Sequence, residues 1–232
     1  MSSIWREGCA IVLLMTASAS GAPSEGLLPI SLDGLCVTKG TIIRQGGKLH
    51  TESPTLRAVV RAKTREVADI RFTYLGPTID TAQLGSGATR RQVGLKLRAE
   101  NGCNLVYAMW RVEPESKLVV SLKRNPGQST HAECENRGYQ NIKPRAQSAV
   151  PKLVPGSHHD LRAVLSGRAL LVFADGARVW EGELPEESST LSGPVGFRSD
   201  NVRVDFEFLA EVEAAGANPL PGNGKCGELD AD

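Results

Sequence analysis

The chain has 232 residues, which is enough for one domain with a large hydrophobic core. Its formal net charge of +1 excludes the strongly basic composition expected of a nucleic-acid-binding protein, so we expect no nucleic-acid partner. Beyond the N-terminal region, no stretch is long and apolar enough to predict a transmembrane helix, so we expect none in the mature protein.

The first 22 residues have the three-part organisation of a secretory signal peptide. Arg6 precedes a short apolar run at residues 9–15, and the small residues that follow offer two peptidase sites, Ala17-Ser18-Ala19 and Ser20-Gly21-Ala22. This run is too short to span a bilayer, which needs about 20 apolar residues. The alternative is a buried N-terminal helix. We predict that residues 1–22 are removed and that the mature chain is exported to the periplasm, the cell surface or the extracellular space.

Alternating apolar and polar residues predict strands along the first half of the chain. Gln45-Gly46-Gly47 predicts a hairpin turn between strands at 41–44 and 48–50. Ile70 to Tyr74 alternates as a half-buried strand. Residues 104–112 and 117–122 carry apolar side chains on both faces, which is typical of central strands, and residues 90–99 are expected beside them.

The second half of the chain repeats the same pattern. The turns Ser166-Gly167 and Asp175-Gly176 separate short alternating runs and predict two successive hairpins. Residues 202–208 form the clearest half-buried strand, with apolar residues on one face and charged residues on the other.

The predicted fold is therefore all-β. No stretch has a convincing helical period, and about a dozen short strands favour a two-sheet antiparallel jelly-roll sandwich over residues 23–213. Two long loops, residues 76–89 and 125–157, are where a binding site is expected. Residues 214–232 are predicted to be an extended, acidic tail rich in Gly and Pro.

Four cysteines follow the signal peptide, and an even number in an exported chain predicts two disulfides. Three pairings are open. The preferred pairing joins Cys103 to Cys134, which would tie neighbouring strands, and Cys36 to Cys226, which would tie the ends of the chain.

Charge is distributed unevenly along the chain. Residues 57–98 are rich in Arg and Lys, whereas residues 181–232 are rich in Asp and Glu. We interpret the two halves as neutralising each other across neighbouring strands. The alternative is that the basic half forms a patch for an anionic polymer.

Two segments carry a resemblance to a known superfamily. Residues 193–202, which begin Gly193-Pro194-Val195-Gly196-Phe197 and run into the last strand, resemble the end of concanavalin A-like lectin/glucanase domains. The hairpins of residues 158–183 and the central strands 94–99 and 104–110 are similar to the same superfamily, especially to laminin G-like modules and the domain of 3-keto-disaccharide hydrolases. The resemblance covers roughly residues 40–212. It implies two curved sheets whose concave face and rim loops bind ligand.

The sequence does not carry the catalytic signatures of this superfamily. No strand has the Glu-x-Asp-x-x-Glu pattern of the glucanases, and the pairs Glu133/Glu135 and Glu181/Glu183 lack a third acid. The Arg-x-Glu-Leu-Arg and Gln-x-His motifs of jelly-roll polysaccharide lyases are absent, and no Gly-x-Ser-x-Gly nucleophile motif occurs. The sequence therefore leans towards a protein that is not an enzyme.

Several residues are candidates for ligand contacts. Side chains that could stack on a sugar ring or frame a groove lie in or beside the central strands and the second long loop: Trp110, Arg111, Lys123, Asn125, His131 and Tyr139. Trp110 is either such a platform or a core residue, depending on which face of its strand points inward. Laminin G-like modules often hold calcium, and the resemblance implies a calcium site at Asp200 and Asp205; the alternative is that Asp200-Asn201 forms a turn.

These features predict a non-catalytic module that binds a glycan or another envelope polymer. Two alternatives remain open. One is a carbohydrate-active enzyme, either a polysaccharide lyase or a glycoside hydrolase, and the other is a structural or protein-binding envelope component. No cofactor other than structural calcium is expected.

Overall fold

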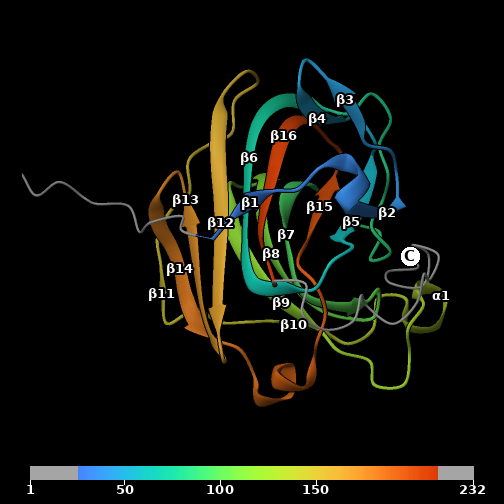
Figure 1. The fold of residues 1–232 in the computed structure, drawn as a ribbon, viewed down its shortest axis with the longest axis vertical. Coiled ribbons are helices and arrows are strands. Elements are labelled where there is room, and N and C mark those ends of the chain that lie inside the picture. Colours follow the sequence, from blue (N-terminus) through green and yellow to red (C-terminus); the bar gives the residue numbers. More distant parts are fainter. Residues whose placement is uncertain (1–25, 214–232) are drawn as a thin grey trace, which may run out of the picture.

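A computed structural model describes residues 26–213, and the predicted signal peptide and the whole of the predicted tail lie outside these residues. The chain folds into two antiparallel sheets that face each other as layers (Figure 1). The all-β sandwich predicted from the sequence is therefore confirmed. The described residues form sixteen strands rather than about a dozen, because several edge strands are only two or three residues long.

The first sheet contains nine strands in the order β11-β14-β13-β12-β6-β16-β4-β3, with β1 paired to β16. Its strands are β1 (Leu28–Pro29), β3 (Ile43–Gln45), β4 (Lys48–Thr51), β6 (Thr64–Pro77), β11 (Ala146–Gln147), β12 (His158–Ser166), β13 (Ala169–Ala174), β14 (Ala177–Glu183) and β16 (Val202–Val212). The three predicted hairpins join β3 to β4, β12 to β13 and β13 to β14.

The second sheet contains seven strands in the order β10-β9-β8-β7-β15-β5-β2. Its strands are β2 (Leu35–Lys39), β5 (Thr55–Val60), β7 (Arg91–Asn101), β8 (Asn104–Glu113), β9 (Lys117–Lys123), β10 (Tyr139–Asn141) and β15 (Gly196–Asp200). The strands predicted to be central, β7, β8 and β9, are consecutive neighbours in this sheet.

Helical structure in the described residues is short. The 3-10 helices η1 (Leu32–Gly34) and η2 (Glu186–Thr190) lie in connections, and α1 (His131–Cys134) lies inside the second long loop. A capping box closes the start of α1, because Glu133 accepts a hydrogen bond from the backbone N–H of Thr130. Within residues 26–213, no helix has the length and apolar character needed to span a membrane.

The main core fills the space between the two sheets. Its largest fully buried side chains include Trp110 of β8, Trp180 of β14 and Phe197 of β15. A smaller cluster, which contains Tyr107 and Met109, lies on the other face of the seven-stranded sheet. Strand β8 is therefore buried on both faces, as its sequence predicted.

Ion pairs link the basic and the acidic parts of the chain across β6 and β16. Arg71 pairs with Glu207 at 3.8 Å, and Arg65 pairs with Glu211 at 3.2 Å. These cross-strand pairs confirm the expected neutralisation for this part of the sheet. Arginines of the seven-stranded sheet have a different environment, described below.

Asp69 of β6 is a buried acid whose pKa is raised. Its side chain is 6% exposed, and its Oδ1 atom has no hydrogen-bond partner among the described residues. Burial first, and then the nearby charge of Asp160, raise the pKa to about 6 against the opposing effect of Arg71.

We expect Asp69→Asn to stabilise the protein at neutral pH. Because the folded-state pKa lies above the unfolded-state value, the folded protein binds more protons between about pH 4 and pH 6, and its stability falls as the pH rises through this window. Asparagine removes this penalty, so urea unfolding at pH 7 should show a gain of about 1–2 kcal/mol. At pH 4 the gain should vanish, and an equal gain at both pH values would contradict the explanation.

Candidate functional site

A pocket of about 280 Å³ lies on the outer face of the seven-stranded sheet, the face that points away from the main core. Every strand of this sheet contributes a lining residue. One from each strand is Lys39 (β2), Thr55 (β5), Arg198 (β15), Gln92 (β7), Tyr107 (β8), Val119 (β9) and Tyr139 (β10). Two loops, residues 78–90 and 124–138, form the rim.

Strand register explains why these residues meet. Arg198 lies opposite Arg57 on one side and opposite Gly94 on the other, and Gly94 lies opposite Met109. One row across the floor therefore joins four strands. At Gly94 a Cβ atom would lie 2.4 Å from the carbonyl oxygen of Ala108 on the neighbouring strand, so only glycine fits at this position.

Buried polar residues fix both rim loops. Asn201, at a positive φ of 55°, forms the turn after β15, and its side chain bonds to both backbone groups of Ala82 and to the carbonyl of Arg90. The chain therefore bends at Asn201, directly after the last residue of β15. Asn125 fixes the second loop by donating to the carbonyls of Cys103 and Arg137.

The predicted disulfide between Cys103 and Cys134 is present. It joins α1 to the turn before β8, and so holds the loop segment that carries His131 next to the sheet. The second predicted pairing stays a prediction, because Cys36 is buried in β2 but Cys226 lies outside the described residues.

The floor of the pocket contains a buried ion-pair network centred on Asp200. Its Oδ1 atom accepts a hydrogen bond from Nη2 of Arg57 at 2.8 Å, and its Oδ2 atom accepts from Nε of Arg198 at 2.9 Å and from Nε2 of Gln92 at 2.6 Å. Asp200 is 1% exposed. Burial alone would raise its pKa, but Arg198 and Arg57 outweigh burial and hold the pKa below its usual range.

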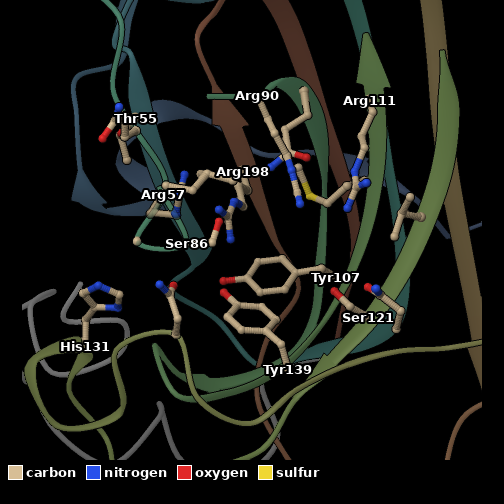
Figure 2. A pocket seen from close by; sticks show the side chains of 18 of the residues that line it. Thr55, Arg57, Ser86, Arg90, Tyr107, Arg111, Ser121, His131, Tyr139 and Arg198 are labelled. Atoms are coloured by element: carbon tan, nitrogen blue, oxygen red, sulfur yellow. The ribbon is translucent and has the colours of Figure 1, made fainter. Parts of the chain in front are cut away.

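Two tyrosines stand beside this network. The rings of Tyr107 and Tyr139 stack with centroids 6.2 Å apart and an interplanar angle of 19°. The guanidinium of Arg198 lies 4.7 Å from the centroid of the Tyr107 ring, a cation–π contact. Figure 2 shows both hydroxyl ends directed towards the same side, with Arg198 next to the Tyr107 ring and Arg90 and Arg111 farther above the two rings.

Three of the six ligand residues predicted from the sequence line the pocket: Arg111, His131 and Tyr139. The other three do not. Trp110 lies in the main core, 0% exposed, because its side chain points to the inner face of β8 together with Val106 and Ala108. This corrects the expectation that Trp110 is a sugar platform.

Lys123 and Asn125 have supporting positions. Lys123 is buried, and its Nζ atom donates to the carbonyl of Gly102 at 2.8 Å and lies 5.2 Å from the centroid of the Tyr139 ring. It therefore contacts a pocket residue without lining the pocket. Asn125 holds the rim loop, as described above.

The structure does not bring the two predicted calcium ligands together. Asp200 belongs to the seven-stranded sheet and is held by two arginines, whereas Asp205 belongs to β16 and its carboxylate lies 2.6 Å from Nδ1 of His50. Residues 26–213 contain no group of three His, Cys, Asp or Glu side chains placed to hold a metal ion. This arrangement gives calcium at Asp200 and Asp205 no support.

A Ser–His–Asp chain occurs elsewhere, on the nine-stranded sheet. His159 contacts Ser157 Oγ through Nε2 and Asp175 Oδ2 through Nδ1, both at 2.8 Å. Three further contacts argue against a nucleophilic role. The Ser157 hydroxyl donates to the carbonyl of Val154, the backbone N–H of Ser157 bonds to the same carbonyl, and the imidazole packs edge-on against Trp110. Because the Ser157 hydroxyl is already bonded to the carbonyl of Val154, we interpret the chain as structural.

The acidic pairs noted in the sequence also lie outside the pocket. Glu133 caps α1, and Glu181 pairs with Arg178 on β14 of the other sheet. None of the described residues that line the pocket is Asp or Glu. The carboxylate pair that glycoside hydrolysis needs is therefore missing from the described walls of this pocket.

Comparisons with known proteins support the fold. No family model and no curated protein matches the sequence. Among solved structures, a carbohydrate binding module, CBM66, from Bacillus subtilis is similar with a TM-score of 0.51 and 13% identity, over 75% of this chain and 91% of that chain. At this identity the similarity establishes the shared sandwich fold and not a shared ligand.

Two further structures are similar at lower scores. A putative glycosyl hydrolase from Parabacteroides distasonis has a TM-score of 0.46 and 10% identity, over 78% of this chain and 89% of that one. Domain 4 of an arabinanase from Geobacillus stearothermophilus, solved with arabinotriose, has a TM-score of 0.42 and 11% identity, over 78% and 84%.

Proposed function

We propose that this protein is an exported, non-catalytic β-sandwich module that binds a glycan in the pocket on its seven-stranded sheet. The observation that carries the proposal is the composition of the pocket. Tyrosine hydroxyls, amides and guanidinium groups converge there, and hydrogen-bonding groups of this kind recognise the hydroxyls of sugars. Membership of the concanavalin A-like superfamily is part of the same proposal, and the sandwich fold supports it.

Export is supported by two features. The predicted signal peptide provides a route out of the cytoplasm. The Cys103–Cys134 disulfide suits an oxidising compartment, where such bonds form and persist. A glycan of the cell envelope or the surroundings would be accessible there.

The experiment that tests the proposal is binding of the purified protein to a polysaccharide array, with calcium and again with a chelator. We expect retention by one polymer class, and equal retention under both conditions because the Asp200 carboxylate is already held by two arginines. An array without any bound polymer would overturn the proposal. Capture of one specific protein partner would then favour a structural or protein-binding role.

One observation favours a second candidate, polysaccharide lyase activity. His131 and Tyr139 line the same pocket as Arg111. In such a reaction an arginine neutralises the carboxylate of a uronate, and a base removes the proton from the carbon that bears this carboxylate. A C=C bond then forms as the bond between the carbon β to the carboxylate and the leaving sugar oxygen breaks. Release of unsaturated product by wild type, but not by the double variant His131→Ala/Tyr139→Phe, would replace the non-catalytic proposal by this one.

A further inference from the structure

We propose that the ligand of this pocket is an anionic glycan, one that carries carboxylate or sulfate groups, and that Arg90 and Arg111 contact the anion. This inference rests on the proposed glycan-binding function and specifies its ligand class.

The first argument is the sign of the charge around the pocket. Five lining residues are permanently cationic, namely Lys39, Arg57, Arg90, Arg111 and Arg198. The described lining residues include no carboxylate, and Asp200 beneath the floor pairs with Arg57 and Arg198. The described lining residues themselves therefore carry five positive charges and no negative charge. The protein as a whole has a net charge of only +1, so the excess is local to this site.

The second argument is that Asp200 neutralises only part of this charge. It pairs with Arg57 and Arg198, and two guanidinium groups sharing one carboxylate keep a net positive charge. Arg198 uses its Nε atom for this pair, and its guanidinium lies over the Tyr107 ring beside the pocket. The network thus fixes both arginine side chains in place, and the single charge of Asp200 does not neutralise both of them.

The third argument concerns Arg111, which has no acidic partner in the described structure. Its side chain is partly buried on β8, and its Nε atom is buried without a hydrogen-bond acceptor among residues 26–213. Burial lowers the pKa of Arg111, and the like charge of Arg90 lowers it further. A guanidinium stays protonated in spite of this, so Arg90 and Arg111 are two neighbouring cations at the pocket with no acidic partner among residues 26–213. An anionic ligand group would relieve this repulsion.

The size of the site favours a short stretch of an anionic sugar chain as the part that is bound. The pocket holds about 280 Å³ and lies under two loops, and the tyrosine pair occupies part of its wall. Close packing of loop residues supports this enclosure, because a Cβ atom at Gly85 would lie 2.6 Å from the amide oxygen of Asn136. A narrow chain that enters such a pocket can place an anion on arginines and its hydroxyls on amides and tyrosines.

The test uses polymers that differ only in charge. The affinity of the full protein is measured for polygalacturonate and its fully methyl-esterified form, and for dextran sulfate and dextran, alongside alginate, hyaluronate and neutral polysaccharides. We expect a carboxylated or a sulfated polymer to bind at least about tenfold more tightly than its neutral counterpart. Binding should also weaken as salt concentration rises.

Two arginine variants assign the contact. Arg111→Gln should reduce affinity for the anionic polymer by about tenfold or more, and should reduce affinity for the neutral counterpart by a clearly smaller factor. The matched control is Arg44→Gln, which removes the same charge from an exposed position on β3 of the other sheet. Unfolding curves of both variants confirm that each is folded.

The outcomes separate this inference from the proposed function. Equal binding of a polymer and its charge-neutralised form, or binding of neutral polysaccharides only, would overturn the anionic ligand and leave glycan binding in place. Equal losses in the Arg111 and Arg44 variants would overturn the assigned contact. Failure to bind any polysaccharide would overturn both proposals.

Discussion

Asp200→Asn should lower the free energy of unfolding by about 3–5 kcal/mol, the usual cost of removing one partner from a buried ion pair. Asparagine leaves the guanidinium groups of Arg57 and Arg198 without their shared counter-charge in the floor of the pocket. Urea unfolding at pH 7 measures the loss. Asp80→Asn is the control, because Asp80 is exposed and its carboxylate has no partner among the described residues.

The stability difference between wild type and Asp200→Asn should depend on pH. The pKa of Asp200 in the folded protein lies below its ordinary value, so its stabilisation is complete above about pH 4 and declines as the pH falls further. The difference between wild type and Asp200→Asn should therefore be constant between pH 5 and pH 7 and shrink in stronger acid. A loss no larger than that of the control would show that the network does not stabilise the fold.

Loss of the Cys103–Cys134 disulfide should have the second largest effect on stability. The bond closes a loop with a sequence separation of 31, for which chain entropy gives a stabilisation of about 3–4 kcal/mol. We expect Cys103→Ser/Cys134→Ser to be less stable by this amount in denaturant unfolding without reductant. An unchanged free energy of unfolding would contradict the entropic account.

The same double variant should bind glycan more weakly. The disulfide anchors α1, which carries His131, and the loop continues directly into β10, which carries Tyr139. Affinity is compared at a temperature where the variant is fully folded, as judged by far-ultraviolet circular dichroism. Full affinity in the folded variant would mean that this loop does not shape the site.

Much of the fold could be predicted from the sequence because its signals are local. Turns such as Asp175-Gly176 lie between alternating runs, and a two-residue turn fixes the pairing of the strands on either side. The edge strands β10 and β11 were not predicted. They contain three and two residues, too few for a period to appear, and they form only because a neighbouring strand pairs with them.

Less of the site could be predicted, for two physical reasons. Strand β8 is apolar on both faces, so no polar face indicates which side chains point inward, and Trp110 was therefore placed as a ligand residue while Tyr107 was not. The charged floor depends on long-range pairing, since Arg57 and Asp200 are 143 positions apart. The alternation of apolar and polar residues along each strand could have identified Arg57 and Arg198 as outward-facing. It could not have shown that the two residues are neighbours.

The basic segment at residues 57–98 has two roles that the sequence left as alternatives. On β6 its arginines are neutralised by acids of β16, as in the pair Arg71–Glu207. Arg57 and Arg90 instead contribute to the pocket, where carboxylates are scarce. Strand pairing decides between the two roles, because it determines which residues face acidic neighbours.

The most direct test of the central claim, that this pocket is the ligand site, is to block its entrance. Ser86 lines the pocket from the first rim loop and is exposed, so Ser86→Trp places a large ring there without disturbing the core. The matched control is Thr81→Trp, an exposed position in the same loop that does not line the pocket. In affinity electrophoresis, a gel that contains the polysaccharide bound by the wild type should retain the Thr81→Trp variant as it retains the wild type. It should not retain Ser86→Trp. Retention of Ser86→Trp at the wild-type level would contradict the account and place the ligand elsewhere on the protein.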